Sequence, residues 1–198
     1  MEEKEETRNW LLKNLQEYFD VETSIVVEKL KIASIPIKVD SVFVDHKPDL
    51  YGPLWILMTF VFTLNIVSYI SHLLSQTTEF YIENFVFSVT ISVFCMFIVP
   101  ALIHFYLSWS GMTVERAWVI STFAYSYCNF IPAATLCIID YEILRWIFVM
   151  LPVATGCMFL YAYVVKEKED FKGNRKLALI AGGASQLGLA MSIQFYFL

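Results

Sequence analysis

Three polar side chains recur at regular spacing within one apolar stretch of the chain. Ser121, Tyr125 and Asn129 are each four residues apart, so on a continuous helix they share one face. Inside a membrane, such a face can line a path for a solute or hydrogen-bond to neighbouring helices. The middle of every apolar stretch lacks Asp, Glu, Lys and Arg, which carriers of protons or charged substrates usually need. The pattern therefore favours hydrogen bonding between helices over transport.

The sequence shows no pattern that supports catalysis or metal binding. It lacks a glycine-rich phosphate loop, a His-Glu-x-x-His, a Gly-x-Ser-x-Gly and an EF-hand loop. His46, His72 and His104 are far apart along the chain. No Cys-x-x-Cys occurs among Cys95, Cys128, Cys137 and Cys157. We therefore expect a protein that is not an enzyme, with no catalytic residue, metal site, cofactor or structural disulfide.

Long apolar stretches predict an all-α integral membrane protein. The 198 residues are 58% hydrophobic and 17% charged, whereas soluble domains have about 25% charged residues. A helix needs about 20 apolar residues to cross the hydrocarbon core. Five stretches meet this requirement, at about 54–74, 85–106, 117–139, 143–165 and 177–197. We expect five transmembrane helices, because neighbouring helices can satisfy the backbone freed by Pro132 and Pro152.

The positions of Lys and Arg predict the orientation of these helices. With five spans, one side of the membrane carries residues 1–53, the segment near Arg116 and the 166–176 loop, with seven, one and five basic residues. The opposite side carries only Arg145. The positive-inside rule then places the N-terminus in the cytosol and the C-terminus in the lumen. Because residues 1–6 are acidic, unlike a signal peptide, we expect the first span to act as the insertion signal.

The segment 1–47 is expected to be a short, partly helical cytosolic region that precedes a membrane domain at 48–198. Apolar residues at helical spacing around 10–19 predict an amphipathic helix, which could dock on the bundle, bind a partner or lie in the membrane interface. A second short helix is expected near 22–31. Residues 24–44 are too apolar for a disordered tail and too few for a core of their own. If a partner covers this segment, the candidate contact residues are Trp10, Leu15, Phe19, Ile35 and Ile37.

Small residues gather in the fifth apolar stretch. They include Ala181, Ser185 and Gly188. Small side chains let helix backbones approach closely in a membrane. We interpret these residues as a packing face, used either within the bundle or in a complex with another membrane protein.

The octapeptide at 49–56 marks the point where the polar segment meets the first span. It reads Asp-Leu-Tyr-Gly-Pro-Leu-Trp-Ile. Gly52 and Pro53 fit the start of a helix, because Pro is favoured in the first turn. Asp49 precedes that start, where the helix dipole favours a carboxylate. Tyr51 and Trp55 have apolar rings with polar tips, which suit the level of the lipid headgroups.

This octapeptide resembles the signature of the Yip domain family, the Ypt/Rab-interacting membrane proteins. The residues that carry the resemblance are Asp49, Leu50, Tyr51, Gly52, Pro53 and Trp55. Residues 18–23 resemble the segment that precedes the signature in the Golgi branch of the family. Ala124-Tyr125-Ser126 resembles a Gly-Tyr-Ser motif of its third membrane helix, with Ala in place of the usual Gly, and 145–147 resembles the start of the fourth helix.

The resemblance implies a non-enzymatic membrane protein that associates with prenylated Rab/Ypt GTPases and with other Yip-family proteins. It implies a place in vesicle-mediated transport between the endoplasmic reticulum and the Golgi, in the lipid bilayer and without a nucleic-acid partner. Two alternatives remain open. The chain could be a channel, lipid-moving protein or transporter that uses the face of Ser121, Tyr125 and Asn129. It could also be a structural subunit of a larger membrane complex.

Overall fold

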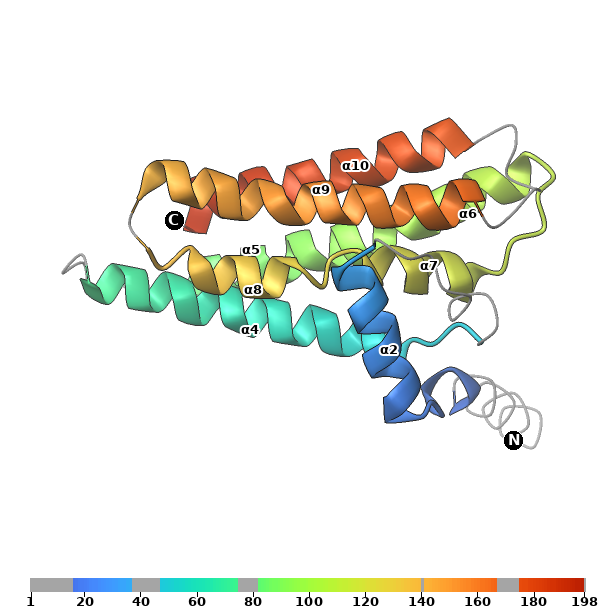
Figure 1. The fold of residues 1–198 in the computed structure, drawn as a ribbon, viewed down its shortest axis with the longest axis horizontal. Coiled ribbons are helices and arrows are strands. Elements are labelled where there is room, and N and C mark those ends of the chain that lie inside the picture. Colours follow the sequence, from blue (N-terminus) through green and yellow to red (C-terminus); the bar gives the residue numbers. More distant parts are fainter. Residues whose placement is uncertain (1–15, 37–46, 75–81, 140, 167–174, 198) are drawn as a thin grey trace, which may run out of the picture.

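The computed structural model describes residues 16–36, 47–74, 82–139, 141–166 and 175–197, and all regular structure in these ranges is helical (Figure 1). The α-helices include α2 (Thr23–Ser34), α4 (Tyr51–Leu74), α5 (Ile82–Val93), α6 (Val99–Trp109), α7 (Arg116–Tyr125), α8 (Phe130–Leu136), α9 (Glu142–Lys166) and α10 (Arg175–Ser192). Two π-helical turns join or extend them, with η1 (Phe94–Ile98) between α5 and α6, and η3 (Ile193–Phe197) after α10. The short helix predicted near 22–31 is confirmed as α2.

Four helical stretches of the described chain are long and apolar enough to cross a membrane. They are Tyr51–Leu74, Ile82–Trp109, Glu142–Tyr163 and Lys176–Phe195. These stretches match the first, second, fourth and fifth spans that the sequence predicts, so the chain is a multi-pass helical membrane protein. Pro152 lies inside α9 without ending it, as expected where neighbouring helices satisfy the freed backbone.

The third predicted span, 117–139, is not one continuous helix, so five spans are not confirmed. Helix α7 ends at Tyr125 and α8 begins at Phe130, with turns between them. Within the turns, the amide of Tyr127 donates to the carbonyl of Ala124 at 3.1 Å, and most of the nearby side chains are buried. Irregular backbone at membrane depth is tolerated only where protein or a cavity surrounds it. The break between α7 and α8 therefore depends on the helices that enclose it.

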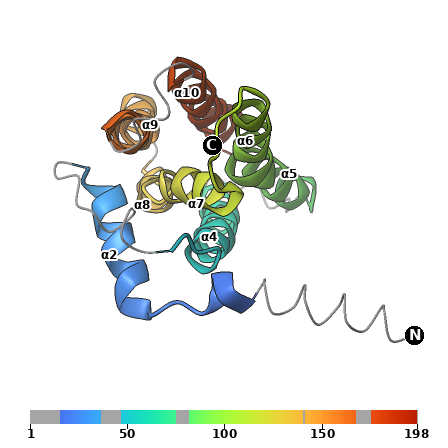
Figure 2. The same ribbon diagram turned by 90° about the vertical axis from the view of Figure 1, so that its right-hand side faces the viewer.

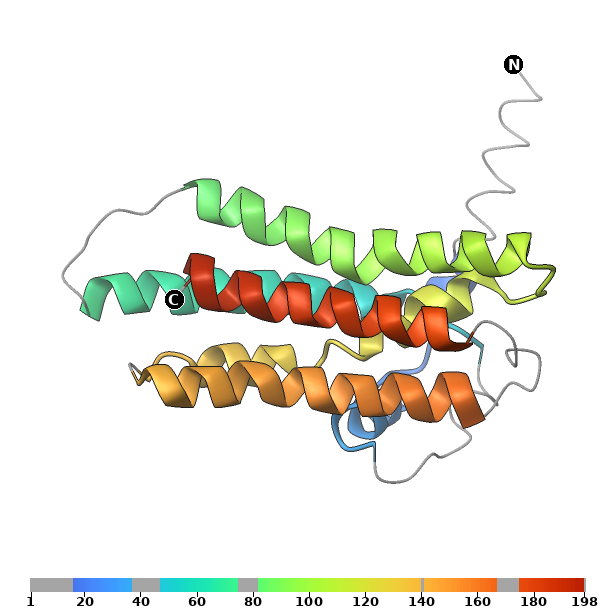
Figure 3. The ribbon, with the colours of Figure 1, turned by 90° about the horizontal axis from the view of Figure 1, so that it is seen from above.

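Helices α7 and α8 occupy the middle of the bundle. Seen end-on, α4, α9, α10 and α6 surround them (Figure 2). From above, the long rods of α5–α6, α10 and α9 lie side by side (Figure 3). The rings of Phe60 in α4 and Phe130 in α8 are fully buried, with centroids 6.2 Å apart in an edge-to-face arrangement. Close aromatic packing of this kind holds the short helix α8 against α4.

Hydrogen bonds from α10 stabilise the break between α7 and α8. The buried side chain of Gln186 donates to the hydroxyl of Ser126 at 2.9 Å. The hydroxyl of Tyr127 lies 2.6 Å from that of Ser185. Opposite Gln186, a Cβ added to Gly156 of α9 would come within 2.6 Å of the Gln186 amide, so the three segments meet closely. Polar contacts at membrane depth thus compensate for the interrupted helix.

The predicted packing face of the fifth span is only partly used within the bundle. Ser185 contacts Tyr127, and Ala181 is half-buried. Gly188 is exposed, and a Cβ added to it would meet nothing within 4 Å. The nearby Gly182 packs tightly instead, because a Cβ there would lie 2.8 Å from Leu160 and 2.9 Å from Phe123.

Candidate functional site

A buried ion pair joins the N-terminal segment to the start of α4. The Nζ of Lys29 in α2 lies 2.5 Å from Oδ2 of Asp49, and the two side chains are 1% and 0% exposed. The same ammonium donates to the carbonyl of Lys47 at 3.2 Å. A buried charge needs both a counter-charge and hydrogen bonds. Lys29 and Asp49 therefore depend on each other, and together they fix α2 to the bundle.

The carboxylate of Asp49 also collects donors from two other parts of the chain. The amide of Gly52 donates to Oδ1 at 2.8 Å, which caps the first turn of α4. The hydroxyl of Tyr125, at the end of α7, donates to the same carboxylate at 3.2–3.3 Å. The ammonium of Lys29 also lies 5.8 Å from the centre of the Tyr125 ring. The cluster Lys29–Asp49–Tyr125 thus joins α2, α4 and α7.

Gly52 allows this cluster to form. A Cβ added to Gly52 would lie 1.9 Å from the hydroxyl oxygen of Tyr125 and 2.5 Å from Cζ of its ring. Atoms cannot approach so closely, so only glycine leaves room for the tyrosine above the first turn of α4. The motifs at 49–53 and 124–126, which are about 70 residues apart in the sequence, are therefore parts of one site.

A second set of polar contacts surrounds the cluster. The amide of Leu50 donates to the carbonyl of Tyr18 at 3.0 Å. The hydroxyl of Tyr18 donates to Glu115 at 3.2 Å. Partial burial and that carboxylate raise the pKa of Tyr18, so at neutral pH it stays a neutral donor. On the surface, Lys47 pairs with Glu17. Residues 16–20 are thus held against both the start of α4 and the loop before α7.

The three polar residues predicted to share a face separate in the structure. Tyr125 points to Asp49. Asn129 donates to the carbonyl of Ser34 and to the hydroxyl of Thr155. The hydroxyl of Ser121 is buried and has no hydrogen-bond partner among the described residues. Because α7 ends at Tyr125, the spacing no longer places all three side chains on one helical face.

The other predicted site residues differ in their exposure. Phe19 and Ile35 are 41% and 64% exposed, whereas Trp10, Leu15 and Ile37 lie outside the described residues. Tyr51 and Trp55 are exposed and pack edge-to-face on each other, with ring centroids 6.1 Å apart. Gly52 and Pro53 are buried, and Leu50 is half-buried. The octapeptide thus has a buried half that builds the cluster and an outward-facing aromatic half.

Lys29 is the residue that the sequence interpretation missed. The buried positions of α2 are Val26, Lys29, Ile32 and Ala33, which recur at helical spacing. A lysine on the apolar face of an amphipathic helix needs a carboxylate partner, and this signal is visible in the sequence. The identity of the partner is not visible, because Asp49 lies 20 residues away.

The geometry gives the cluster a structural rather than a reactive character. The carboxylate already accepts from an ammonium, an amide and a hydroxyl, so little capacity remains for a substrate. Among the described residues, no group of three His, Cys, Asp or Glu is placed to hold a metal ion. The arrangement can fix the position of α2 on the bundle and the angle at which the chain meets the first span.

Comparison with known proteins shows what this chain is similar to. The chain is similar to the Protein YIPF1 homolog of Dictyostelium discoideum, with 28% identity over 185 residues. The alignment covers 90% of this chain and 53% of that protein, so the chain spans about half the length of this relative. No family model matches the chain, and no solved structure matches it. The similarity to the YIPF1 homolog agrees with the resemblance to the Yip family that the motif at 49–56 carries.

Proposed function

We propose that the protein is a non-enzymatic membrane adaptor of the Golgi and early secretory pathway. It associates with prenylated Rab/Ypt GTPases, and with other Yip-family proteins, during vesicle-mediated transport between the endoplasmic reticulum and the Golgi. Similarity to the YIPF1 homolog supports this class of function. In this proposal, α7 and α8 together form the third of five spans, which leaves the N-terminus in the cytosol and the C-terminus in the lumen.

The observation that carries the proposal is the docked but incompletely covered N-terminal segment. Lys29 fixes one face of α2 to the bundle. Apolar side chains remain exposed beside it, with Phe19 at 41%, Val27 at 42% and Ile35 at 64%. Exposed apolar groups held on a rigid scaffold are suited to protein recognition. Covering one such side chain contributes about 1.5–3 kcal/mol, which corresponds to roughly a ten- to hundredfold gain in affinity.

The transport alternative receives less support from the geometry. A polar path needs groups that are free to bind a solute. Tyr125 and Asn129 instead donate to partners within the protein, and they do not share a face with Ser121. If the protein is instead a structural subunit of a larger complex, the exposed part of α10 around Gly188 is the candidate surface for contact with another membrane protein.

The proposed orientation predicts different accessibility for the two ends of the chain. A tag placed at Met1 should be cleaved by protease on intact microsomes, and a tag placed after Leu198 should be protected until detergent is added. The reason is the uneven distribution of Lys and Arg, with 13 on one proposed side and Arg145 alone on the other. Equal sensitivity of the two tags would refute an odd number of spans.

The proposed contact surface predicts a specific loss of partner binding. In the double variant Phe19→Asp with Ile35→Asp, Rab GTPase recovered by co-purification should fall at least tenfold, because two exposed apolar contacts become charged. The steady-state level of the protein should stay close to wild type, since both side chains are exposed. Quantitative immunoblotting of the protein and of the co-purified GTPase measures both quantities.

Lys31→Asp is the matched control for this experiment. It makes the same change in net charge as the double variant, and Lys31 is an exposed residue of the same helix. We expect it to retain most of the Rab binding. Undiminished recovery with the double variant would exclude these residues as a contact surface, and equal loss in the control would show that charge alone is responsible.

A further inference from the structure

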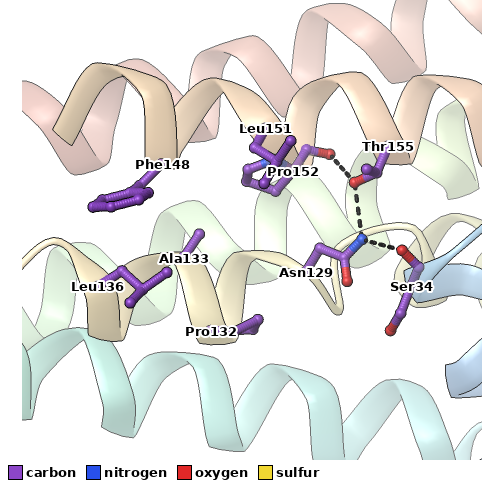
Figure 4. A pocket seen from close by; sticks show the side chains of 9 residues that line it. All are labelled: Ser34, Asn129, Pro132, Ala133, Leu136, Phe148, Leu151, Pro152 and Thr155. Atoms are coloured by element: carbon purple, nitrogen blue, oxygen red, sulfur yellow. Dashed lines mark hydrogen bonds between the residues drawn. The ribbon is translucent and has the colours of Figure 1, made fainter. Parts of the chain in front are cut away.

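A groove opens between α8 and α9, on the side of the bundle where α2 ends. It has a volume of about 200 Å³. Figure 4 shows its lining, which is largely apolar and comprises Ser34, Asn129, Pro132, Ala133, Leu136, Phe148, Leu151, Pro152 and Thr155. The small side chain of Ala133 leaves room opposite Pro152. None of the contacts described above involves this groove, apart from the hydrogen bonds of Asn129.

The polar end of the groove is already satisfied by the protein itself. The amide of Asn129 donates to Thr155 at 2.8 Å and to the carbonyl of Ser34 at 3.0 Å (Figure 4). The hydroxyl of Thr155 in turn donates to the carbonyl of Pro152 at 3.2 Å. A polar ligand would have to displace these bonds, which is costly inside a protein. The free surface of the groove is therefore suited to hydrocarbon.

The position of the groove within the membrane indicates which hydrocarbon group can reach it. Pro152 is ten residues from the start of α9, which places it about 15 Å along the helix and near the middle of a hydrocarbon core about 30 Å thick. At the rim, Leu151 and Leu136 are 60% and 46% exposed. In a membrane these side chains face lipid, so the groove is continuous with the lipid-facing surface of α9.

We infer that the groove between α8 and α9 binds one acyl chain of a membrane lipid. The acyl chain lies along Ala133 and Pro152. The hydrogen-bonded Asn129–Thr155 end of the groove limits how far the acyl chain extends. This inference goes beyond the proposed adaptor function and does not depend on it. Because the carbonyl of Ser34 belongs to α2, a lipid in this groove also lies next to the docked N-terminal helix.

The experiment uses the purified protein in nanodiscs of phosphatidylcholine that carries a photoreactive diazirine within one acyl chain. After illumination, peptide mass spectrometry should locate the label on groove residues such as Leu136, Phe148 and Leu151. The variant Ala133→Phe fills the groove and should abolish labelling of Phe148. Ala133→Leu is the milder variant if the first does not fold. The control Ala154→Phe enlarges an exposed residue of α9 and should leave the groove labelling unchanged.

Three results would overturn the inference. One is labelling of Phe148 that persists in a folded Ala133→Phe or Ala133→Leu variant. Another is labelling spread evenly over all lipid-facing residues of α9, which would indicate ordinary lipid contact. The third is labelling by a farnesylated peptide with a diazirine, but not by the lipid, which would assign the groove to the prenyl group of a partner. The Rab recovery test is independent of all three results, so either proposal can fail alone.

Discussion

The variant Asp49→Ala is expected to lose about 3–5 kcal/mol of unfolding free energy, because it leaves the buried ammonium of Lys29 without its counter-charge. The side chain of Lys29 is only 1% exposed. The variant also removes the acceptor for the amide of Gly52 and for the hydroxyl of Tyr125. Chemical denaturation in detergent micelles measures the loss. The losses of unfolding free energy caused by Lys29→Met and by Asp49→Ala should not be additive, since both variants break the same ion pair.

A double variant distinguishes the ion pair from a general packing effect. Lys29→Met with Asp49→Asn removes both charges, and the new amide oxygen can still accept from Gly52. The double variant should regain most of the unfolding free energy that Asp49→Ala loses, because replacing both partners of a buried ion pair is often close to neutral. Lys47→Ala is the control, since its pair with Glu17 is exposed, and little change is expected there. An Asp49→Ala protein as stable as the wild type would contradict the role given to the cluster.

The variant Gly52→Ala is expected to destabilise the protein by about 1–3 kcal/mol, because one added methyl group overpacks the site. Its Cβ would lie 1.9 Å from the hydroxyl oxygen of Tyr125. The tyrosine is fully buried and hydrogen-bonded to Asp49, so it cannot move aside freely. In a Tyr125→Leu background, the same Gly52→Ala change should cost less, because the clashing ring is gone.

Gly188→Ala is the matched control for this prediction. A Cβ at Gly188 meets no atom within 4 Å, and alanine is the better helix former. The control should therefore be neutral or slightly stabilising. Equal effects of the two glycine substitutions in the same denaturation assay would show that the contact with Tyr125 does not limit residue 52.

The elements of this fold that local patterns specify could be predicted from the sequence. Four of the five predicted spans are continuous helices in the structure, because length and apolarity alone define them. Gly52 and Pro53 were expected at a helix start, and they lie in the first turn of α4. The short helix α2 also follows from its own amphipathic spacing.

The break in the third predicted span depends on contacts between helices that are distant in the sequence. Gln186 of α10 and Thr155 of α9 supply hydrogen bonds to Ser126 and Asn129, and periodicity does not reveal such partners. Pro132 was expected inside a continuous helix. It instead lies in the first turn of α8, where a missing amide costs nothing.

The candidate site was predicted in separate pieces. Asp49 was interpreted as a charge near a helix dipole, and Tyr125 as part of a polar face. Only the tertiary structure brings the two together with Lys29. The buried pair with Lys29 also explains why the octapeptide begins with an acidic residue. The helix dipole alone would favour a carboxylate at this position by only about 0.3–1 kcal/mol.

The central claim is that α2 is fixed on the bundle beside the break between α7 and α8, and a disulfide test measures this most directly. The hydroxyl oxygen of Ser34 lies 3.5 Å from the sulfur of Cys128, so a cysteine at position 34 would place its sulfur beside that of Cys128. Ser34→Cys in native membranes, treated with a membrane-permeant oxidant, should give peptides linked between position 34 and Cys128. Ser24→Cys, at the exposed start of α2, should give none, and Asp49→Ala should reduce the linkage in the Ser34→Cys protein. Absence of the link between position 34 and Cys128, in a protein present at its normal level, would contradict the docked position of α2.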